Sequence, residues 1–495
     1  MLKNYKSYLP NIVAIVYTVL LAIIISLSLN SNPLSNFELS HDSAMFQYFG
    51  YAMDKGFIVY KDIFDHKGPF IFIFNYIAIV LGKYGLYLVE LFFLTLFLIF
   101  VYKTAKLYVN LINSLIITTL VSLFIPYLYE GGNTVEEYAT PFMMISLYIF
   151  SKYFLNKEVT NIHIILLGIS FSIVALIRFN MISIWCIFVL VILINLISKQ
   201  EYKLLINYIF NFIIGILIIF LPLGIYLYVN NALYEAFYQS FIFNMYYIGD
   251  GESILHVLRS FSLRPVIIMM CVVFGSSLIF INYKDKYHLA IVGSIILTSV
   301  SVLLSKRDYP HYLLALLPLM AASLVFIFQK ITFNFKYLLA ILILSFPIIM
   351  DNFIIFSYRN VTSYSKIASS INEVQNMTYN NELNMSEIQK VSEYVRNNTN
   401  NEDLIYTHRL SGNIYLESDR LANTKYFALP ATDVTNNEKV VSEFFESMNN
   451  SRPKLLVVYR SFAENEQEGF ELDFQKYILN NYKVVYETDS YLVYK

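Results

Sequence analysis

Charged residues are scarce in this 495-residue sequence, where Asp, Glu, Lys and Arg make up 14% of the chain against 57% hydrophobic residues. So little charge excludes the two to four soluble domains that a chain of this length would usually form. An excess of either sign is also missing, since 35 Lys and Arg stand against 36 Asp and Glu. Bulk charge therefore gives no indication of a nucleic-acid partner. The composition predicts a polytopic membrane protein.

Cysteine is nearly absent as well. The two cysteines, Cys186 and Cys271, lie in apolar runs, and we interpret them as small apolar side chains rather than as a disulfide or metal ligands. The polar part of the chain has no Gly-rich phosphate loop, which argues against nucleotide binding. Ile, Asn, Lys, Tyr and Phe are abundant instead, a bias typical of an AT-rich bacterial genome.

Long apolar runs follow one another until about residue 356. A helix needs about twenty mostly apolar residues to cross ~30 Å of hydrocarbon, so we predict a mainly α membrane protein with roughly eleven spans. Their approximate ranges are 11–29, 86–102, 111–127, 139–155, 162–178, 181–198, 205–229, 263–281, 288–304, 311–329 and 337–356. The first lacks a cleavage site and is interpreted as an anchor. The segment Pro69–Leu81 is too short to span and is predicted to lie at the interface.

Lysine falls in alternate loops, and this sets the orientation because cytoplasmic loops retain positive charge. With the N-terminus inside, the inner loops carry pairs of lysines that begin at Lys103, Lys152, Lys199, Lys284 and Lys330. The opposite loops hold most of the carboxylates. We therefore predict a multi-pass protein of the cell membrane with a cytoplasmic N-terminus and its polar chemistry on the outer face.

The composition changes after Phe356, where the chain becomes rich in Asn, Glu, Ser and Lys. Periodicity predicts helices at 386–396 and 470–479 and strands at 403–407, 454–459, 482–487 and 491–494. We predict a membrane domain at 1–356, with a first outer loop and its interfacial helices at about 30–85. A small extracytoplasmic α/β domain follows at 357–495.

The first outer loop carries two groups suited to catalysis. Asp42 precedes Ala44–Met53, which has the spacing of an amphipathic helix. A carboxylate there can act as general base on an acceptor hydroxyl, or Asp42 or Ser43 can merely cap the helix. Asp65-His66-Lys67 comes before a Gly-Pro bend and offers cationic donors to a phosphate. A plain surface turn is the alternative for this second group.

The sequence resembles the polytopic GT-C glycosyltransferases. The resemblance is carried by Asp42, by the stretches 50–60 and 60–69, and by Arg307–His311. The sequence is most similar to the branch of the protein O-mannosyltransferases and the lipid A aminoarabinose transferase, in a bacterial cell-envelope form. The resemblance implies that Asp42 is the essential acidic residue of the first outer loop. It also implies that Lys67 and Pro69 correspond to a motif that helps to hold the lipid phosphate.

The motifs differ from those of many relatives, which have Asp-Glu where this chain has Asp42-Ser43 and Lys-Pro-Pro where it has His66-Lys67-Gly68-Pro69. The resemblance therefore leaves open whether a divalent metal ion takes part.

Further polar residues are predicted on the outer face. Glu136 and Glu137 precede the fourth span and either orient the sugar or acceptor or form a solvated acidic loop. Asp65 and Tyr309 are also predicted to contact the sugar or acceptor. Arg307 and His311 follow the ninth span, where cations break the inside-positive pattern. We favour contact with a phosphate over an ion pair of Arg307 with the adjacent Asp308. Arg178 is a third outer cation, and because burying it at mid-bilayer would cost roughly 2.5–3.5 kcal/mol, it should face a polar cavity or the outer rim.

Together these patterns predict an inverting glycosyltransferase that moves a sugar from a polyprenyl-phosphate carrier to a wall polysaccharide, teichoic acid, glycolipid or protein. Asp42 is the predicted base, and Lys67, His66, Arg307, His311 and Arg178 are the predicted phosphate ligands. A transporter or flippase of lipid-linked glycans is the main alternative, but we find neither a string of intramembrane ionisable residues nor two matching halves. A membrane-anchored binding protein would not need so many spans.

A tag beside Lys152 tests the predicted orientation. We expect a membrane-impermeant reagent to label it only after the cells are opened, because this loop is predicted to be cytoplasmic. A tag beside Asp54, in the first outer loop, is the matched control and should react in intact cells. Labelling beside Lys152 in intact cells would show that the orientation is wrong.

Overall fold

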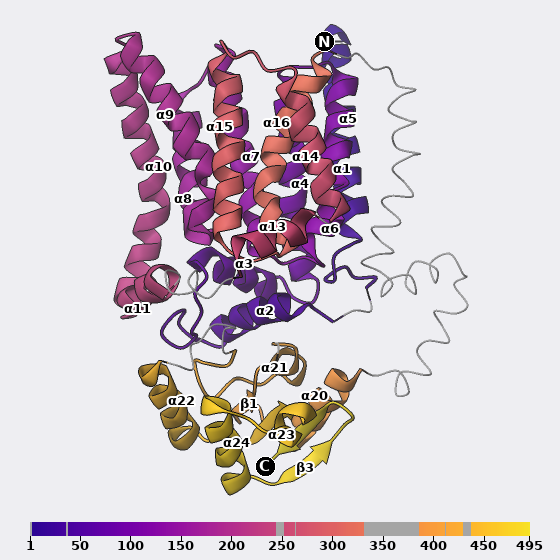
Figure 1. The fold of residues 1–495 in the computed structure, drawn as a ribbon, viewed down its shortest axis with the longest axis vertical. Coiled ribbons are helices and arrows are strands. Elements are labelled where there is room, and N and C mark those ends of the chain that lie inside the picture. The colour runs from indigo at the N-terminus through magenta and orange to yellow at the C-terminus, as the bar shows by residue number, and fades with distance from the viewer. Residues whose placement is uncertain are drawn as a thin grey trace, which may run out of the picture. The chain divides into compact units, whose positions relative to one another are not determined.

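The computed structural model describes residues 2–35, 38–243, 252–262, 264–330, 386–410, 412–428 and 437–495, which are mainly helical (Figure 1). The chain divides into two compact units. The first comprises Met1–Ser35, Tyr87–Tyr226 and Gly251–Val361, and the second comprises Asn36–Leu86, Leu227–Asp250 and Thr362–Lys495. The sequence did not predict that the first outer loop and residues 227–250 belong to one unit with the C-terminal segment. The division at residue 356 stays a prediction.

A helix occupies each predicted span that the structure describes. The helices are α1 (Leu2–Ser26), α4 (Gly85–Lys106), α5 (Leu111–Ser122) with α6 (Ile125–Tyr129), α7 (Val135–Phe154), α8 (Asn161–Ile177), α9 (Ser183–Ser198), α10 (Tyr202–Val229), α14 (Pro265–Leu278), α15 (Lys286–Leu304), and the 3-10 helix η3 (Pro310–Leu316) with α16 (Leu317–Phe328). The predicted span at 337–356 lies outside the described residues.

Length and apolar composition identify six of these helices as able to cross a membrane. A seventh results if α13 (Ile254–Ser262) and α14, which bend by 90° at their junction, form one span. Helices α8 and α9 are apolar but shorter. The protein is thus a multi-pass membrane protein, and the total of about eleven spans stays a prediction.

The spans pack lengthwise in the first unit, where α7 contacts α8, α15 contacts α9, and α5 contacts α1 and α16 (Figure 1). Gly168 and Gly215 allow the backbones of α8 and α10 to touch, because a Cβ at either position would collide with the facing backbone. Cys186 and Cys271 are both free and exposed.

The first outer loop forms α2 (His41–Asp54) and α3 (Pro69–Val80), which confirms both helices expected there. Our assignment of the cap was wrong: Ser40 caps α2 by accepting a hydrogen bond from the Ser43 N–H at 3.3 Å. Asp42 is exposed in the first helical turn. Gln47 of α2 donates to Asn75 of α3 at 2.6 Å in the buried contact between these helices.

The C-terminal part of the second unit has a four-stranded sheet, as predicted. Its strands are β1 (Ile405–Thr407), β2 (Leu455–Tyr459), β3 (Val484–Glu487) and β4 (Tyr491–Tyr494), in the order β1-β2-β4-β3. Only β1 and β2 pair in parallel, with Ile405 opposite Leu455, and β4 pairs antiparallel with β2 and β3. The helices are α20 (Glu387–Asn398), α21 (Asn413–Ser418), α22 (Glu438–Asn450), α23 (Arg460–Glu464) and α24 (Gly469–Asn481).

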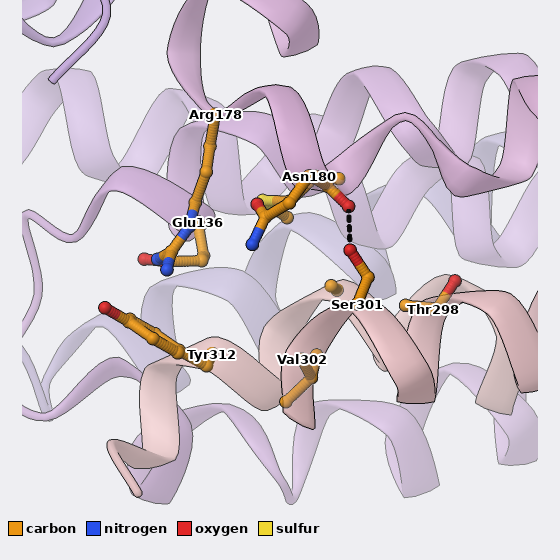
Figure 2. Close-up of a pocket in the computed structure, with 9 residues that line it drawn as sticks. Glu136, Arg178, Asn180, Thr298, Ser301, Val302 and Tyr312 are labelled. Carbon is orange, nitrogen blue, oxygen red and sulfur yellow. Dashed lines mark hydrogen bonds and ion pairs between the residues drawn. The ribbon is translucent and has the colours of Figure 1, made fainter. Parts of the chain in front are cut away.

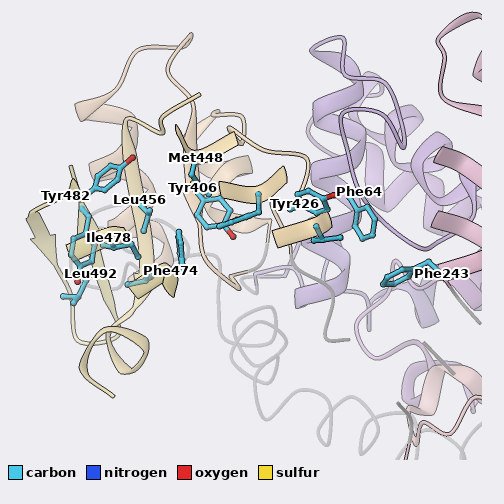
Figure 3. Close-up of a cluster of buried hydrophobic side chains, with 14 residues drawn as sticks. Phe64, Phe243, Tyr406, Tyr426, Met448, Leu456, Phe474, Ile478, Tyr482 and Leu492 are labelled. Carbon is cyan, nitrogen blue, oxygen red and sulfur yellow. The ribbon is translucent and has the colours of Figure 1, made fainter. Parts of the chain in front are cut away.

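The core of the second unit extends from this sheet into the first outer loop (Figure 3). Phe64 of the loop lies between Tyr426 and Phe243, with ring centroids 5.1 and 5.5 Å away. On α2, the buried Tyr48 packs against Phe427, with ring centroids 4.2 Å apart. Segments distant in sequence thereby share one apolar core, and this sharing fixes the loop that carries the predicted phosphate ligands.

Replacing Gly50 by Ala tests the packing of α2 on α3. A Cβ there would collide with the Asn75 backbone carbonyl, so we expect about 1–3 kcal/mol of destabilisation, measured as a lower Tm. Gly224 in α10 is the control, because a Cβ there meets nothing within 4 Å and Ala has the better helix propensity. Equal effects of the two substitutions would contradict the close approach.

Candidate functional site

Asp65 organises the cationic group of the first outer loop. Its side chain is almost completely buried, and it accepts a hydrogen bond from the Lys67 N–H at 2.8 Å. The Lys67 Nζ lies 3.5 Å from Asp65 Oδ1, and the His66 Nδ1 lies 4.0 Å from it. Lys67 also lies 5.3 Å from the ring centroid of Phe46 and is only 18% exposed in its side chain. This group is therefore a built cluster rather than an exposed turn.

Gln239 fixes the backbone on which this cluster sits. It is fully buried in the π-helix Tyr238–Ile242, after α11 (Leu233–Phe237). The side-chain Oε1 of Gln239 accepts a hydrogen bond from the Asp65 N–H at 3.2 Å, and its side-chain Nε2 donates one to the Tyr60 backbone carbonyl at 2.8 Å. Single-turn π-helices are frequent at functional sites. One side chain from residues 227–250 thus holds both ends of the loop segment 60–65.

Tyr60 closes the same segment from inside. Its backbone has a φ of 68°, and its hydroxyl donates to the Lys67 carbonyl at 2.8 Å. Burial, with a smaller contribution from the Asp65 charge, raises the pKa of Tyr60 well above its ordinary value, so the phenol remains a donor.

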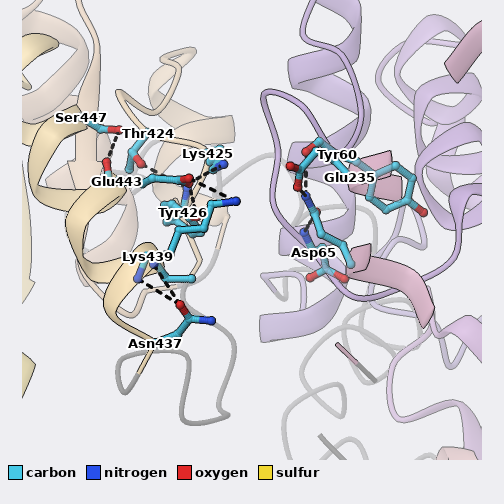
Figure 4. Close-up of polar contacts among 12 residues, drawn as sticks. Tyr60, Asp65, Glu235, Thr424, Lys425, Tyr426, Asn437, Lys439, Glu443 and Ser447 are labelled. Carbon is cyan, nitrogen blue, oxygen red and sulfur yellow. Dashed lines mark hydrogen bonds and ion pairs between the residues drawn. The ribbon is translucent and has the colours of Figure 1, made fainter. Parts of the chain in front are cut away.

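The C-terminal part of the unit supports the loop from the other side (Figure 4). The Phe64 N–H donates to the Lys425 carbonyl at 3.0 Å. Glu443 then holds Lys425 by an ion pair at 2.7 Å and accepts from the Tyr426 hydroxyl at 2.7 Å.

Asp42 belongs to the same unit as this cluster. It shares a face of α2 with Phe46, which is four residues further on and lies against Lys67. The carboxylate is exposed in the first turn of the helix. The second unit therefore contains Asp42, Asp65, His66 and Lys67.

Glu136 and Arg178 form an ion pair in the first unit (Figure 2). Glu136 lies in the first turn of α7, and Arg178 ends α8. The Arg178 guanidinium carbon also lies 3.6 Å from the ring centroid of Tyr312. These groups line a small pocket together with Asn180, Met181, Thr298, Ser301, Val302 and Ala315. Arg178 is thus paired with a carboxylate beside this pocket, and its exposure to a polar cavity or the outer rim stays a prediction.

The acidic loop before α7 is not solvated, because Glu136 and Glu137 are both buried. Glu137 accepts from the Thr134 N–H at 3.3 Å in a capping box that starts the helix.

Glu130 and His311 form another pair in the first unit. The Glu130 Oε2 lies 2.5 Å from the His311 Nδ1 and also accepts from the His311 N–H at 3.3 Å. Tyr309 stacks on the imidazole, with centroids 5.5 Å apart. The carboxylate assigns a proton to Nδ1 and fixes the ring orientation.

Asp308 has partners on α13 and at the start of α14. The Asp308 carboxylate accepts hydrogen bonds from the Ser260 hydroxyl at 2.6 Å and from the Arg264 guanidinium at 3.4 Å. The Ser260 bond makes the larger contribution and the Arg264 charge a smaller one to lowering the pKa of Asp308. Arg307 lies in the same segment, between α15 and η3. The first unit therefore contains Arg178, Arg307, His311, Glu136, Glu137 and Tyr309.

Sequence reasoning missed Glu90 and Gln239. Glu90 is fully buried on α4 and accepts hydrogen bonds from the Asn133 N–H and the Ser31 hydroxyl. A lone carboxylate in an apolar run was a usable signal for it. Nothing in the sequence distinguishes Gln239 from other polar residues. Among the described residues, no three His, Cys, Asp or Glu side chains converge on a possible metal site.

The sequence matches two family models that cover most of the chain. Residues 4–341 match the competence-induced protein Ccs4 N-terminal domain, and residues 385–495 match the Ccs4 C-terminal domain. No curated protein matches the sequence.

Two solved structures of GT-C membrane glycosyltransferases resemble the fold. ArnT from Cupriavidus metallidurans, bound to undecaprenyl phosphate, aligns over 97% of both chains with a TM-score of 0.63 and 11% identity. The oligosaccharyltransferase AglB from Archaeoglobus fulgidus, in complex with an inhibitory peptide and a dolichol phosphate, aligns over 92% of this chain and 70% of its own. Its TM-score is 0.52 and its identity 10%. At such low identity, the likeness concerns the fold.

Replacing Gln239 by Met tests its hold on the loop. The substitution removes both hydrogen bonds at similar side-chain length, so we expect the Asp65 amide to lose about 1–3 kcal/mol of protection in hydrogen exchange. Gln239→Glu is the matched variant, because it keeps the acceptor for the Asp65 N–H and should retain more protection. Unchanged exchange in Gln239→Met would contradict this role.

Proposed function

The chain belongs to the family of the competence-induced protein Ccs4, and we propose that it is a glycosyltransferase that uses a polyprenyl-phosphate-linked sugar. The observation that carries the proposal is the fold, which is shared over 97% of both chains with ArnT bound to undecaprenyl phosphate. We propose transfer to a cell-envelope acceptor at the outer membrane face, with a cytoplasmic N-terminus and the C-terminal domain outside. The acceptor is a glycan, teichoic acid, glycolipid or protein.

Lys67 is the proposed primary ligand of the donor phosphate. Asp65 and Phe46 hold its ammonium in place before a substrate arrives, so little reorganisation is needed on binding. His66 lies beside it, and Arg307, His311 and Arg178 are the proposed cations of the first unit. Negative charge grows on the departing phosphate in the transition state, where fixed cations stabilise it most.

Asp42 is the proposed general base. Its exposed carboxylate takes the proton of the acceptor hydroxyl while the acceptor oxygen bonds to the anomeric carbon. The bond from that carbon to the phosphate oxygen breaks, and its electron pair stays on the lipid phosphate. One such displacement inverts the anomeric configuration. No metal ion is assigned a step.

The pocket at Glu136 is the proposed contact for sugar or acceptor hydroxyls. The Glu136 Oε2 is buried and has no hydrogen-bond partner among the described residues, so it is able to accept from a hydroxyl. Tyr309 adds an aromatic face beside His311. Glu137 contributes through its capping box, which fixes the turn that carries Glu136. Asp65 contributes to donor binding indirectly, because its carboxylate holds the Lys67 ammonium.

Replacing Asp42 by Asn tests the assigned base. We expect transfer to fall by about 10²–10⁴-fold with donor binding retained, because the amide cannot take the proton. The measurement is release of polyprenyl phosphate coupled to acceptor labelling, with purified protein and labelled polyprenyl-phosphate sugars.

Asp54→Asn is the matched control, since Asp54 is an exposed carboxylate at the other end of α2. It should transfer at the rate of the unmodified protein. Full activity of Asp42→Asn would refute the base, and lipid translocation without phosphate release would favour a flippase.

A further inference from the structure

Glu90 is a buried ionisable group that the proposed mechanism does not use. It lies near the N-terminal end of α4 and has no exposed surface. Ionisable side chains within apolar spans are costly and usually have a functional partner. The partner here is a turn of the chain: the Glu90 Oε1 accepts from the Asn133 N–H at 2.5 Å. Ser31 donates to the other carboxylate oxygen.

The turn at Glu130–Asn133 has an unusual backbone. Four consecutive residues have positive φ, with values of 50°, 95°, 95° and 56° from Glu130 to Asn133. Glycine adopts such values at no steric cost, whereas Glu130 does not. Non-glycine residues remain in this region only where their surroundings enforce it, often at functional sites.

The surroundings of the turn do enforce it. Besides the bond to Glu90, the Asn30 N–H donates to the Gly131 carbonyl at 2.7 Å, and the Tyr138 hydroxyl donates to the Asn133 Oδ1 at 2.7 Å. A Cβ at Gly132 would collide with Glu90 itself. The Glu90 carboxylate is thus the surface against which the turn is packed.

The turn carries a functional group at each end. Glu130, its first residue, contacts the ring and the backbone N–H of His311. Three residues after Asn133, Glu136 pairs with Arg178. A displacement of the turn would therefore move two carboxylates that hold proposed phosphate ligands.

We infer that Glu90 is a positioning residue, which holds the Glu130–Asn133 turn so that Glu130 fixes the imidazole of His311. The inference rests on the proposed function, in which His311 contacts the donor phosphate. Glu90 acts through the turn and does not itself touch substrate.

The experiment compares Glu90→Ala, Glu90→Gln and Glu130→Gln by the ring NMR resonances of His311 in histidine-labelled protein. We expect Glu90→Ala to shift these resonances in the direction of Glu130→Gln. A variant that combines Glu90→Ala with Glu130→Gln should shift the His311 resonances no further than either single variant. Both changes break the same chain of contacts, from Glu90 through the turn and Glu130 to His311. Glu90→Gln keeps an acceptor for the Asn133 N–H and should restore the unmodified signal. The donor KM should rise about 10-fold in Glu90→Ala, as expected for one lost charge-assisted hydrogen bond.

A second variant keeps the test decisive if Glu90→Ala does not fold. Gly132→Ala pushes the turn away from Glu90 while leaving the carboxylate in place, and it should give the same shift. An unmoved His311 signal in a folded variant, or additive shifts in the double variant, would overturn the inference. Absence of transfer by the unmodified protein would contradict the proposed function, and the NMR comparison would still decide the positioning.

Discussion

Burying a charge in an apolar medium is costly unless an opposite charge or hydrogen-bond donors compensate it, and the polar groups of this protein are arranged around that constraint. Two carboxylates at helix ends lie against partners from distant parts of the chain: Glu136 against Arg178 and Glu130 against His311. Each pair joins two helices or a helix and a turn. The polar contacts that make burial tolerable therefore also determine which helix ends meet.

The same principle holds in the second unit, where Tyr60 and residues 63–65 of the first outer loop are buried. Its buried backbone groups need partners, and Gln239, Tyr60 and Lys425 supply them. Gln239 and Lys425 come from other parts of the sequence, and Tyr60 belongs to the segment itself. This short loop thereby obtains a defined backbone without a long secondary-structure element of its own.

The helices and strands were largely predictable from the sequence, because apolar periodicity and run length report local structure directly. The helix at Pro69, the hairpin before the C-terminus and the helix after Asp42 all appear. The cap was mistaken because Ser40, Asp42 and Ser43 are all plausible caps, and only the backbone geometry selects Ser40. The pairs at the candidate site were beyond prediction, since Glu130 and His311 are 181 residues apart and their meeting depends on how the helices pack.

The pairing of Lys67 with Asp65 has a consequence for selectivity. At a distance the two charges cancel, so this cluster exerts little long-range attraction on soluble anions such as nucleotides or inorganic phosphate. In the proposed function, its attraction acts only at contact, once the donor phosphate displaces or joins the Asp65 interaction. A carrier lipid that diffuses within the bilayer reaches such a cluster without electrostatic steering, whereas a soluble competitor gains nothing from it. In the proposed function, the cancellation of the two charges therefore favours a donor that arrives through the bilayer over an anion that arrives from solution.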